Sequence, residues 1–148
     1  MLDKQFFLKV APNVRDRYKE HIFGKGKDVF GRKFKGYSKE YGEAKRGNKF
    51  PLQASKYANT TSPILTEATA NDFGLFKSSI NDNGFIMGWS TYGSRVVSLN
   101  KMGRVLSSKS QPMPKEVINY MMSRAKPFTD KKLKRTFPKS KTFNVGKK

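Results

Sequence analysis

The chain of 148 residues contains no cysteine. Without thiols it has neither a disulfide framework nor a thiolate metal site, so no covalent crosslink compensates for its small size. This absence fits a protein of the cytosol or of an assembled particle. The length is typical of one domain, and only 36% of the residues are hydrophobic. We therefore expect one modest core with extensions.

Catalytic motifs are equally scarce. The chain has a single histidine, His21, and it lacks the Gly-x-Ser-x-Gly, His-Glu-x-x-His and phosphate-loop patterns. We interpret His21 as a structural or solvent-exposed residue of a helix. Asp28, Glu43 and Lys45 resemble the carboxylates and lysine of metal-dependent nucleases, but the Glu-x-Lys pair of such sites lies on a strand and here it follows a helix-like or loop segment. We predict no enzyme activity, no catalytic residue, no metal and no cofactor.

Long hydrophobic runs are absent as well. The apolar patch within residues 1–10 is interrupted by charge and is too short for a signal-peptide core or a membrane span. We expect a protein that is soluble or bound to a particle.

Positive charge is what the chain has in excess. Lys and Arg number 31 against 11 Asp and Glu, which gives a formal net charge of +20. Fourteen of the basic residues lie in 1–50, three in 51–100 and fourteen in 101–148. Such a charge attracts polyanions or acidic protein surfaces, and the total alone does not choose between them. The middle third is comparatively neutral.

The first half of the chain predicts one helix and an irregular arm. Apolar residues at i, i+4 and i+8 predict an amphipathic helix over 11–24, with Pro12 in its first turn. Glycine and lysine dominate the following stretch, and an arm around 24–63 lacks periodicity apart from one or two helical turns over 38–45.

The second half predicts a small sheet and a second helix. Alternating apolar residues predict strands over 75–80 and 85–90 around an Asn83–Gly84 turn, and a β-rich run predicts a third strand over 95–99. A helix over 115–126 follows, ended by Pro127. The predicted fold is α+β: a small antiparallel sheet of three or more strands packed with two amphipathic helices, plus the irregular arm and a basic C-terminal tail. Residues 1–130 form one domain in this prediction, and 131–148 form the extended tail.

Two sets of residues are candidates for contacts with other molecules. The aromatic residues of the arm are suited to packing on a neighbouring subunit: Phe30, Phe34, Tyr37 and Tyr41. The basic residues at the start of the tail are suited to a polyanion or an acidic surface: Lys131, Lys132, Lys134 and Arg135. The simpler interpretation of the aromatics is that they anchor the arm on the core or on a neighbouring subunit. Core positions are the simpler interpretation for Trp89, Met113, Met121 and Met122.

Three spaced segments resemble the virion morphogenesis proteins of tailed bacteriophages, which act in tail completion or in the neck. They are residues 28–45 (DVFGRKFKGYSKEYGEAK), 64–66 (ILT) and 75–80 (LFKSSI). The similarity spans about residues 20–104, and residues 67–74 depart from the Thr-Gly that usually follows the Leu-Thr. The resemblance implies a ring at the head–tail junction of the virion, made in the host cytoplasm, with no cofactor and no catalytic residues.

The leading hypothesis is therefore an oligomeric adaptor at the neck or tail-completion position. Its partners would be further copies of itself, portal, connector or tail proteins, and packaged DNA, with no membrane and no small-molecule substrate. The alternative is a sequence-nonspecific nucleic-acid-binding protein that uses the basic clusters for phosphates and the aromatics for stacking. A metal-dependent nuclease using Asp28, Glu43 and Lys45 is a third hypothesis.

Overall fold

The structure is a computed structural model that describes residues 2–34 and 68–136, without the side chains of residues 133, 134 and 136. These ranges contain helices and a two-stranded antiparallel sheet, so the predicted α+β class is confirmed. The predicted helical turns over 38–45 lie outside the described residues.

Helix α1 (Lys4–Lys19) is the central element, and it continues into a π-helical turn, η1 (Glu20–Gly24). Asp3 caps its first turn by accepting a hydrogen bond from the backbone N–H of Phe6 at 3.1 Å. The helix begins at Lys4 instead of residue 11, and Pro12 lies inside it, so the predicted start was wrong. Proline removes one backbone donor, but residues on both sides of Pro12 pack into the core and hold the helix together: Phe6, Phe7, Val10, Ala11, Val14 and Tyr18.

The predicted hairpin is present. Strands β1 (Phe73–Asn81) and β2 (Gly84–Trp89) pair antiparallel, with Phe73 opposite Trp89 and Phe76 opposite Ile86. Beyond Phe76 the register shifts, and the hydroxyl of Ser79 accepts a hydrogen bond from the backbone N–H of Ile86 at 2.8 Å. The hairpin is therefore regular at its open end and bulged near the turn.

Aromatic side chains join the hairpin to α1. The ring of Tyr18 stacks on Phe73 with centroids 4.4 Å apart, and Trp89 meets Tyr18 edge-on at 6.2 Å. The hydroxyl of Tyr18 donates to the backbone carbonyl of Leu106 at 2.5 Å. Burial raises the pKa of Tyr18, so this hydroxyl stays protonated and remains a donor. Tyr18 thus binds three segments that are far apart in sequence.

The predicted third strand is wrong, because residues 95–99 lie in helix α4 (Gly93–Lys101). The short helix α3 (Ala68–Asp72) precedes β1 and ends in Asp72. The Asp72 carboxylate accepts hydrogen bonds from the backbone N–H groups of Thr91 and Tyr92 and from the hydroxyl of Ser90. The bond from Tyr92 is the main cause that holds the pKa of Asp72 below its ordinary value, against the opposing effect of burial. This contact turns the chain away from the sheet after β2, which overrides the local strand preference.

Helix α5 (Lys115–Thr136) extends beyond its predicted end. Pro127 lies inside it, and residues 131–136 are helical where an extended tail was predicted. Packing stabilises the helical turn after Pro127, because the Phe128 ring contacts the Phe6 ring with centroids 5.3 Å apart. Further along, the ammonium of Lys132 pairs with the Asp3 carboxylate at 2.9 Å. These contacts keep the helix regular past the proline.

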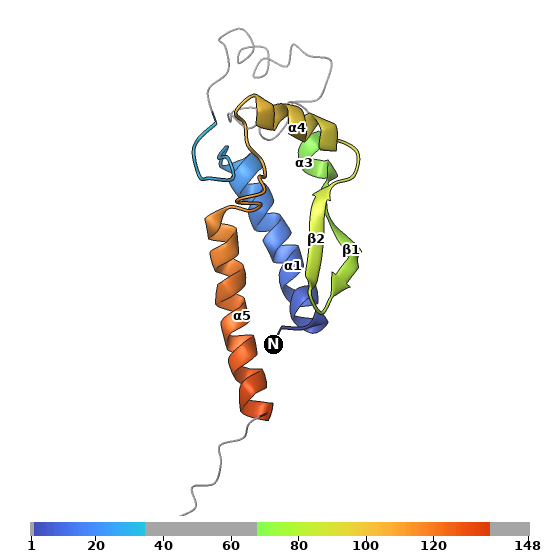
Figure 1. Cartoon of the computed structure of the whole chain (residues 1–148), viewed down its shortest axis with the longest axis vertical. Helices are drawn as coiled ribbons and strands as arrows, with labels where there is room; N and C mark the ends of the chain where they lie inside the picture. Colours follow the sequence, from blue (N-terminus) through green and yellow to red (C-terminus); the bar gives the residue numbers. More distant parts are fainter. Residues whose placement is uncertain (1, 35–67, 137–148) are drawn as a thin grey trace, which may run out of the picture.

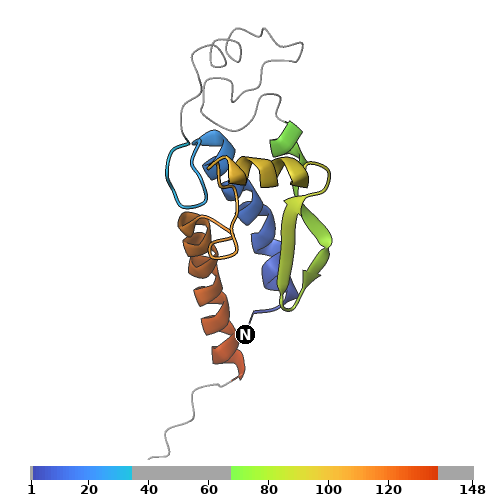
Figure 2. The same ribbon diagram turned by 45° about the horizontal axis from the view of Figure 1, so that its top comes forward.

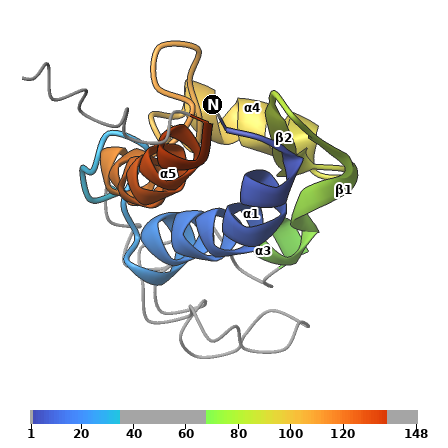
Figure 3. The same cartoon turned by 90° about the horizontal axis from the view of Figure 1, so that it is seen from below.

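The hairpin and α5 lie on opposite sides of α1 (Figure 1). The view from below shows the same order, with α1 between α5 and the two strands (Figure 3). Helix α4 lies at the end of the molecule where α1 finishes (Figure 2). The buried core follows α1 and includes Val96, Leu106 and Val117 from the second half of the chain. α1 therefore supplies the surface on which the other elements pack.

We expect Tyr18→Phe to lower the free energy of unfolding by about 1–2 kcal/mol, because the buried carbonyl of Leu106 loses its donor while the ring stack remains. Urea denaturation followed by circular dichroism measures this. Tyr92→Phe is the matched control, since the Tyr92 ring is only half-buried. Equal stability of the two variants would contradict the assigned role of the Tyr18 hydroxyl.

Candidate interaction surfaces

The loop of residues 25–34, which follows η1, contains the first predicted site residues. It folds back through an isolated bridge between Lys27 and Lys33 and through a hydrogen bond from the Phe34 N–H to the Gly26 carbonyl. Its Val29 N–H donates to the Val105 carbonyl at 2.9 Å, and the Gln111 side-chain amide donates to the Val29 carbonyl at 2.7 Å. The loop is thus fixed to the segment between α4 and α5.

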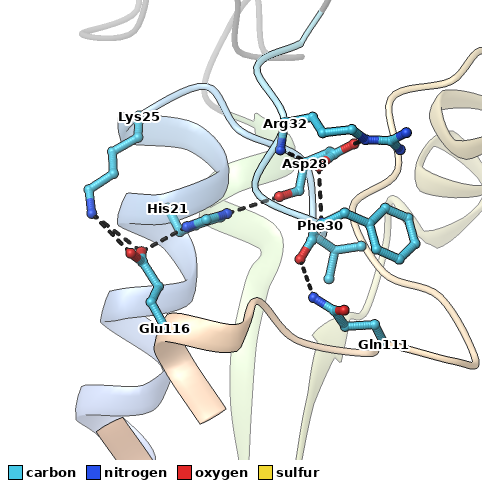
Figure 4. Close-up of polar contacts among 8 residues, drawn as sticks. His21, Lys25, Asp28, Phe30, Arg32, Gln111 and Glu116 are labelled. Atoms are coloured by element: carbon cyan, nitrogen blue, oxygen red, sulfur yellow. Dashed lines mark hydrogen bonds and ion pairs between the residues drawn. The ribbon is translucent and has the colours of Figure 1, made fainter. Parts of the chain in front are cut away.

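His21 anchors the same loop from below (Figure 4). The ring is 4% exposed, with Nδ1 2.7 Å from Glu116 Oε1 and Nε2 2.9 Å from the Asp28 carbonyl. Both ring nitrogens thus have a hydrogen-bond partner within the chain. Lys25 also contacts Glu116, at 3.3 Å. Burial raises the pKa of Glu116, but hydrogen bonds from His21 and Lys25 outweigh it and hold that pKa below its ordinary value. His21 therefore has a structural position here.

Asp28 closes the loop instead of standing free for a metal. Its side chain is 5% exposed, and Oδ1 accepts hydrogen bonds from the backbone N–H groups of Phe30 at 3.0 Å and Arg32 at 2.9 Å. The Arg32 guanidinium donates to Oδ2 at 2.9 Å (Figure 4). Glu43 and Lys45 lie outside the described residues, and the described part contains no group of three or more His, Asp or Glu side chains arranged to hold a metal ion. Both oxygens of the Asp28 carboxylate are therefore hydrogen-bonded within the loop.

The predicted aromatic residues have different environments. Phe34 is 5% exposed and belongs to the hydrophobic core, so its ring is not available to a neighbouring subunit and the interface assignment is corrected. The loop folds back far enough to bury it. Phe30 is 43% exposed, with the Arg32 guanidinium 5.1 Å from the centre of its ring. Tyr37 and Tyr41 lie outside the described residues. Phe30 keeps the exposure that an interface residue needs.

The predicted basic residues lie on the last turns of α5. Lys131, Lys132 and Arg135 are exposed, and Lys134 lies in the same helix without a described side chain. The hydrogen bond from Lys132 is the main cause that lowers the pKa of Asp3. Lys132 therefore has an acidic partner within its own chain. Contact of these residues with a polyanion stays a prediction.

An open apolar groove separates α5 from the hairpin, with α1 at its base. We call it the methionine groove; it has a volume of about 540 Å³ and is formed chiefly by Phe7, Phe85, Met87, Met113, Met121 and Met122. Met113 and Met121 are half-buried and Met122 is 63% exposed, so the core assignment was wrong for Met122. The sequence shows that these residues are apolar, but their exposure follows from the separation of α5 and the hairpin by α1.

The outer face of the hairpin is a second apolar surface. Phe76 and Ile86, which are cross-strand partners, are 40% and 61% exposed. The next cross-strand pair on the same face is Gly74 and Gly88, which carry no side chains. The Phe76 ring lies beside Gly88, 3.7 Å from the position that a Cβ atom would take there. Phe76, Ile86 and the two glycines form the hairpin face, which is flat, apolar and open to close approach.

No helix in the described part of the chain is both long and apolar enough to cross a membrane. Comparison with protein-family models, curated proteins and solved structures finds no match for the chain.

We expect Asp28→Ala to lower the free energy of unfolding by about 2–3 kcal/mol, because two backbone donors and one guanidinium lose their acceptor. Thermal and urea denaturation measure the loss. Asp16→Ala is the matched control: this carboxylate is 62% exposed and pairs with Arg15 at the surface, so its removal changes stability by no more than about 0.5 kcal/mol. If Asp28→Ala is as stable as the control, Asp28 does not hold the loop.

Proposed function

We propose that this chain is a structural subunit that assembles with further copies of itself, as an adaptor at the head–tail junction of a tailed-phage virion. The observation that carries the assembly proposal is the pair of open apolar surfaces, the methionine groove and the hairpin face. The resemblance of residues 28–45, 64–66 and 75–80 to phage tail-completion and neck proteins supports the location. The proposed role is structural, with no catalytic step.

The charge distribution favours contact through the hairpin. Most carboxylates in the described part accept hydrogen bonds or ion pairs from their own chain, among them Asp3, Asp28, Asp72, Asp82 and Glu116. Basic side chains thus remain in excess at the surface, and two copies repel each other wherever such surfaces meet. Residues 51–100 carry only three basic residues, and they include the hairpin. Copies can approach there at the smallest electrostatic cost.

The two apolar surfaces are different, which favours a head-to-tail contact. In the proposed contact, Phe76 and Ile86 of one subunit enter the methionine groove of the next. Methionine side chains adapt to an incoming apolar group because they are unbranched and flexible. A contact between two different patches leaves one patch free at each end and closes only as a ring. The exposure of Phe30 supports a contribution of this ring to such an interface.

The proposed neighbours are portal, connector or tail proteins on the two faces of the ring, with packaged DNA in its channel. Lys131, Lys132, Lys134 and Arg135 are the proposed contacts to DNA or to acidic protein surfaces. Screening by salt reduces the repulsion between subunits and weakens these contacts. Self-assembly and electrostatic contact should therefore respond to salt in opposite directions.

We expect the wild-type protein to form a discrete oligomer at high salt, and Phe76→Asp or Met122→Asp each to prevent it, because a carboxylate is placed in an apolar contact. Size-exclusion chromatography with light scattering and native mass spectrometry measure the state. Val97→Asp is the matched control, since Val97 is 53% exposed on α4 and lies outside both surfaces.

Mixing the two variants gives a sharper test of the head-to-tail contact. Phe76 lies outside the groove lining, so Phe76→Asp keeps an intact groove, and Met122→Asp keeps an intact hairpin face. An equimolar mixture should therefore form dimers that neither variant forms alone. A wild-type protein that stays monomeric at all concentrations and salts would contradict the assembly proposal. Co-elution of the wild-type oligomer with purified phage heads or tails tests the location.

A further inference from the structure

A second groove, of about 270 Å³, lies between α1 and α5, which run antiparallel (Figure 1). Its base is apolar and includes Phe6 and Val10, and most of the residues on its two sides carry polar groups. Lys9 and Asn13 line the α1 side of the groove. Arg17 lies four residues after Asn13 and so continues the same row of side chains along the helix. Tyr120, Arg124 and Phe128 line the α5 side with the same spacing. We call these two stripes the basic groove.

Two arginines are held in place by one aromatic ring. The guanidinium of Arg17 lies 4.0 Å from the centre of the Tyr120 ring, and that of Arg124 lies 5.4 Å from it. A guanidinium over an aromatic face loses little freedom when its N–H groups later bind an acceptor. The contact therefore orients two cations, one from each helix, at the mouth of the basic groove.

These cations have no acidic partner within the described residues. Within residues 2–34 and 68–136 no ion pair involves Lys9, Arg17 or Arg124, and no carboxylate lines the groove. Lys131 and Arg135 continue the Arg124 and Phe128 stripe along α5 at helical spacing, and both are exposed. A row of unneutralised cations therefore runs along α5 beside Lys9 and Arg17.

We propose that the basic groove binds the phosphodiester backbone of nucleic acid without reading its sequence. Lys9 and Arg17 are eight residues apart on α1, about 12 Å along its axis, and Arg124 comes from α5 across the groove. The groove therefore presents several cations to a ligand that carries a charge on every repeating unit. Arginine forks match phosphate oxygens in bidentate fashion. The Tyr120 ring is engaged by both arginines, so the contact is with phosphates and the bases do not stack on it.

The test measures fluorescence anisotropy of a short labelled DNA duplex with full-length protein over a series of salt concentrations. We expect the triple variant Lys9→Gln, Arg17→Gln and Arg124→Gln to bind about 10-fold more weakly or worse, with the slope of log K against log salt reduced by about 2–3. The charge-matched control removes three exposed cations elsewhere: Lys77→Gln, Arg95→Gln and Lys101→Gln. Arg95 lies 4.7 Å from the Tyr92 ring and matches the stacked arginines of the groove.

Equal losses in the two triple variants would overturn the proposal, because binding would then follow net charge alone. Poly-glutamate is the competing probe: if it binds as tightly as DNA and is lost with the same three groove residues, the groove recognises acidic protein surfaces and the nucleic-acid proposal fails. Arg17→Lys with Arg124→Lys keeps the charge, so it should keep the salt slope if the groove residues act through phosphate contacts. A circular dichroism melt of each variant separates loss of binding from loss of fold.

Discussion

The stack of Tyr18 on Phe73, together with the hydrogen bond from Tyr18 to the Leu106 carbonyl, fixes the arrangement on which the remaining surfaces depend. It holds the hairpin and the segment after α4 against one side of α1. On the other side, Phe6 meets Phe128 and attaches α5. Because α1 separates α5 from the hairpin, the flanks of α1 stay uncovered in the described part of the chain. One flank is the methionine groove and the other is the basic groove.

The two grooves differ in the chemistry of their side chains: one is apolar and the other is basic. The hairpin face lies in the part of the chain with the fewest basic residues, and the methionine groove is lined chiefly by apolar side chains, so both suit contact between copies of a strongly basic chain. The basic groove presents Lys9, Arg17 and Arg124 without carboxylate partners in the described residues, so it suits a polyanion. Several carboxylates form ion pairs within the chain, such as Asp3 with Lys132 and Asp28 with Arg32. These pairs stabilise the fold and leave the positive surface of the basic groove without neutralising carboxylates. Assembly and polyanion contact thus use different faces.

Local patterns predicted the parts of the fold that local interactions determine. The alternation over 85–90 and the turn residues near Asn83 identify the hairpin, and the apolar spacing after Pro114 identifies α5. The failures have nonlocal causes: the Asp72 carboxylate turns residues 93–101 into a helix, and core packing carries α1 and α5 through Pro12 and Pro127. The exposure of Met122 and the pairing of Arg17 with Tyr120 depend on how α1 and α5 are placed. The spacing of Lys9, Asn13 and Arg17 was visible in the sequence, but their partners on α5 were not.

The central claim is that the methionine groove is covered when copies assemble, and methionine oxidation tests it directly. Met122 and Met102 are 63% and 72% exposed, so both should react with dilute peroxide in the monomer, and only Met122 lies in the groove. Mass spectrometry of peptides oxidised at low and high protein concentration follows both residues in one sample. The account predicts that Met122 becomes protected as concentration rises while Met102 stays reactive. Equal reactivity of the two residues at every concentration would contradict it.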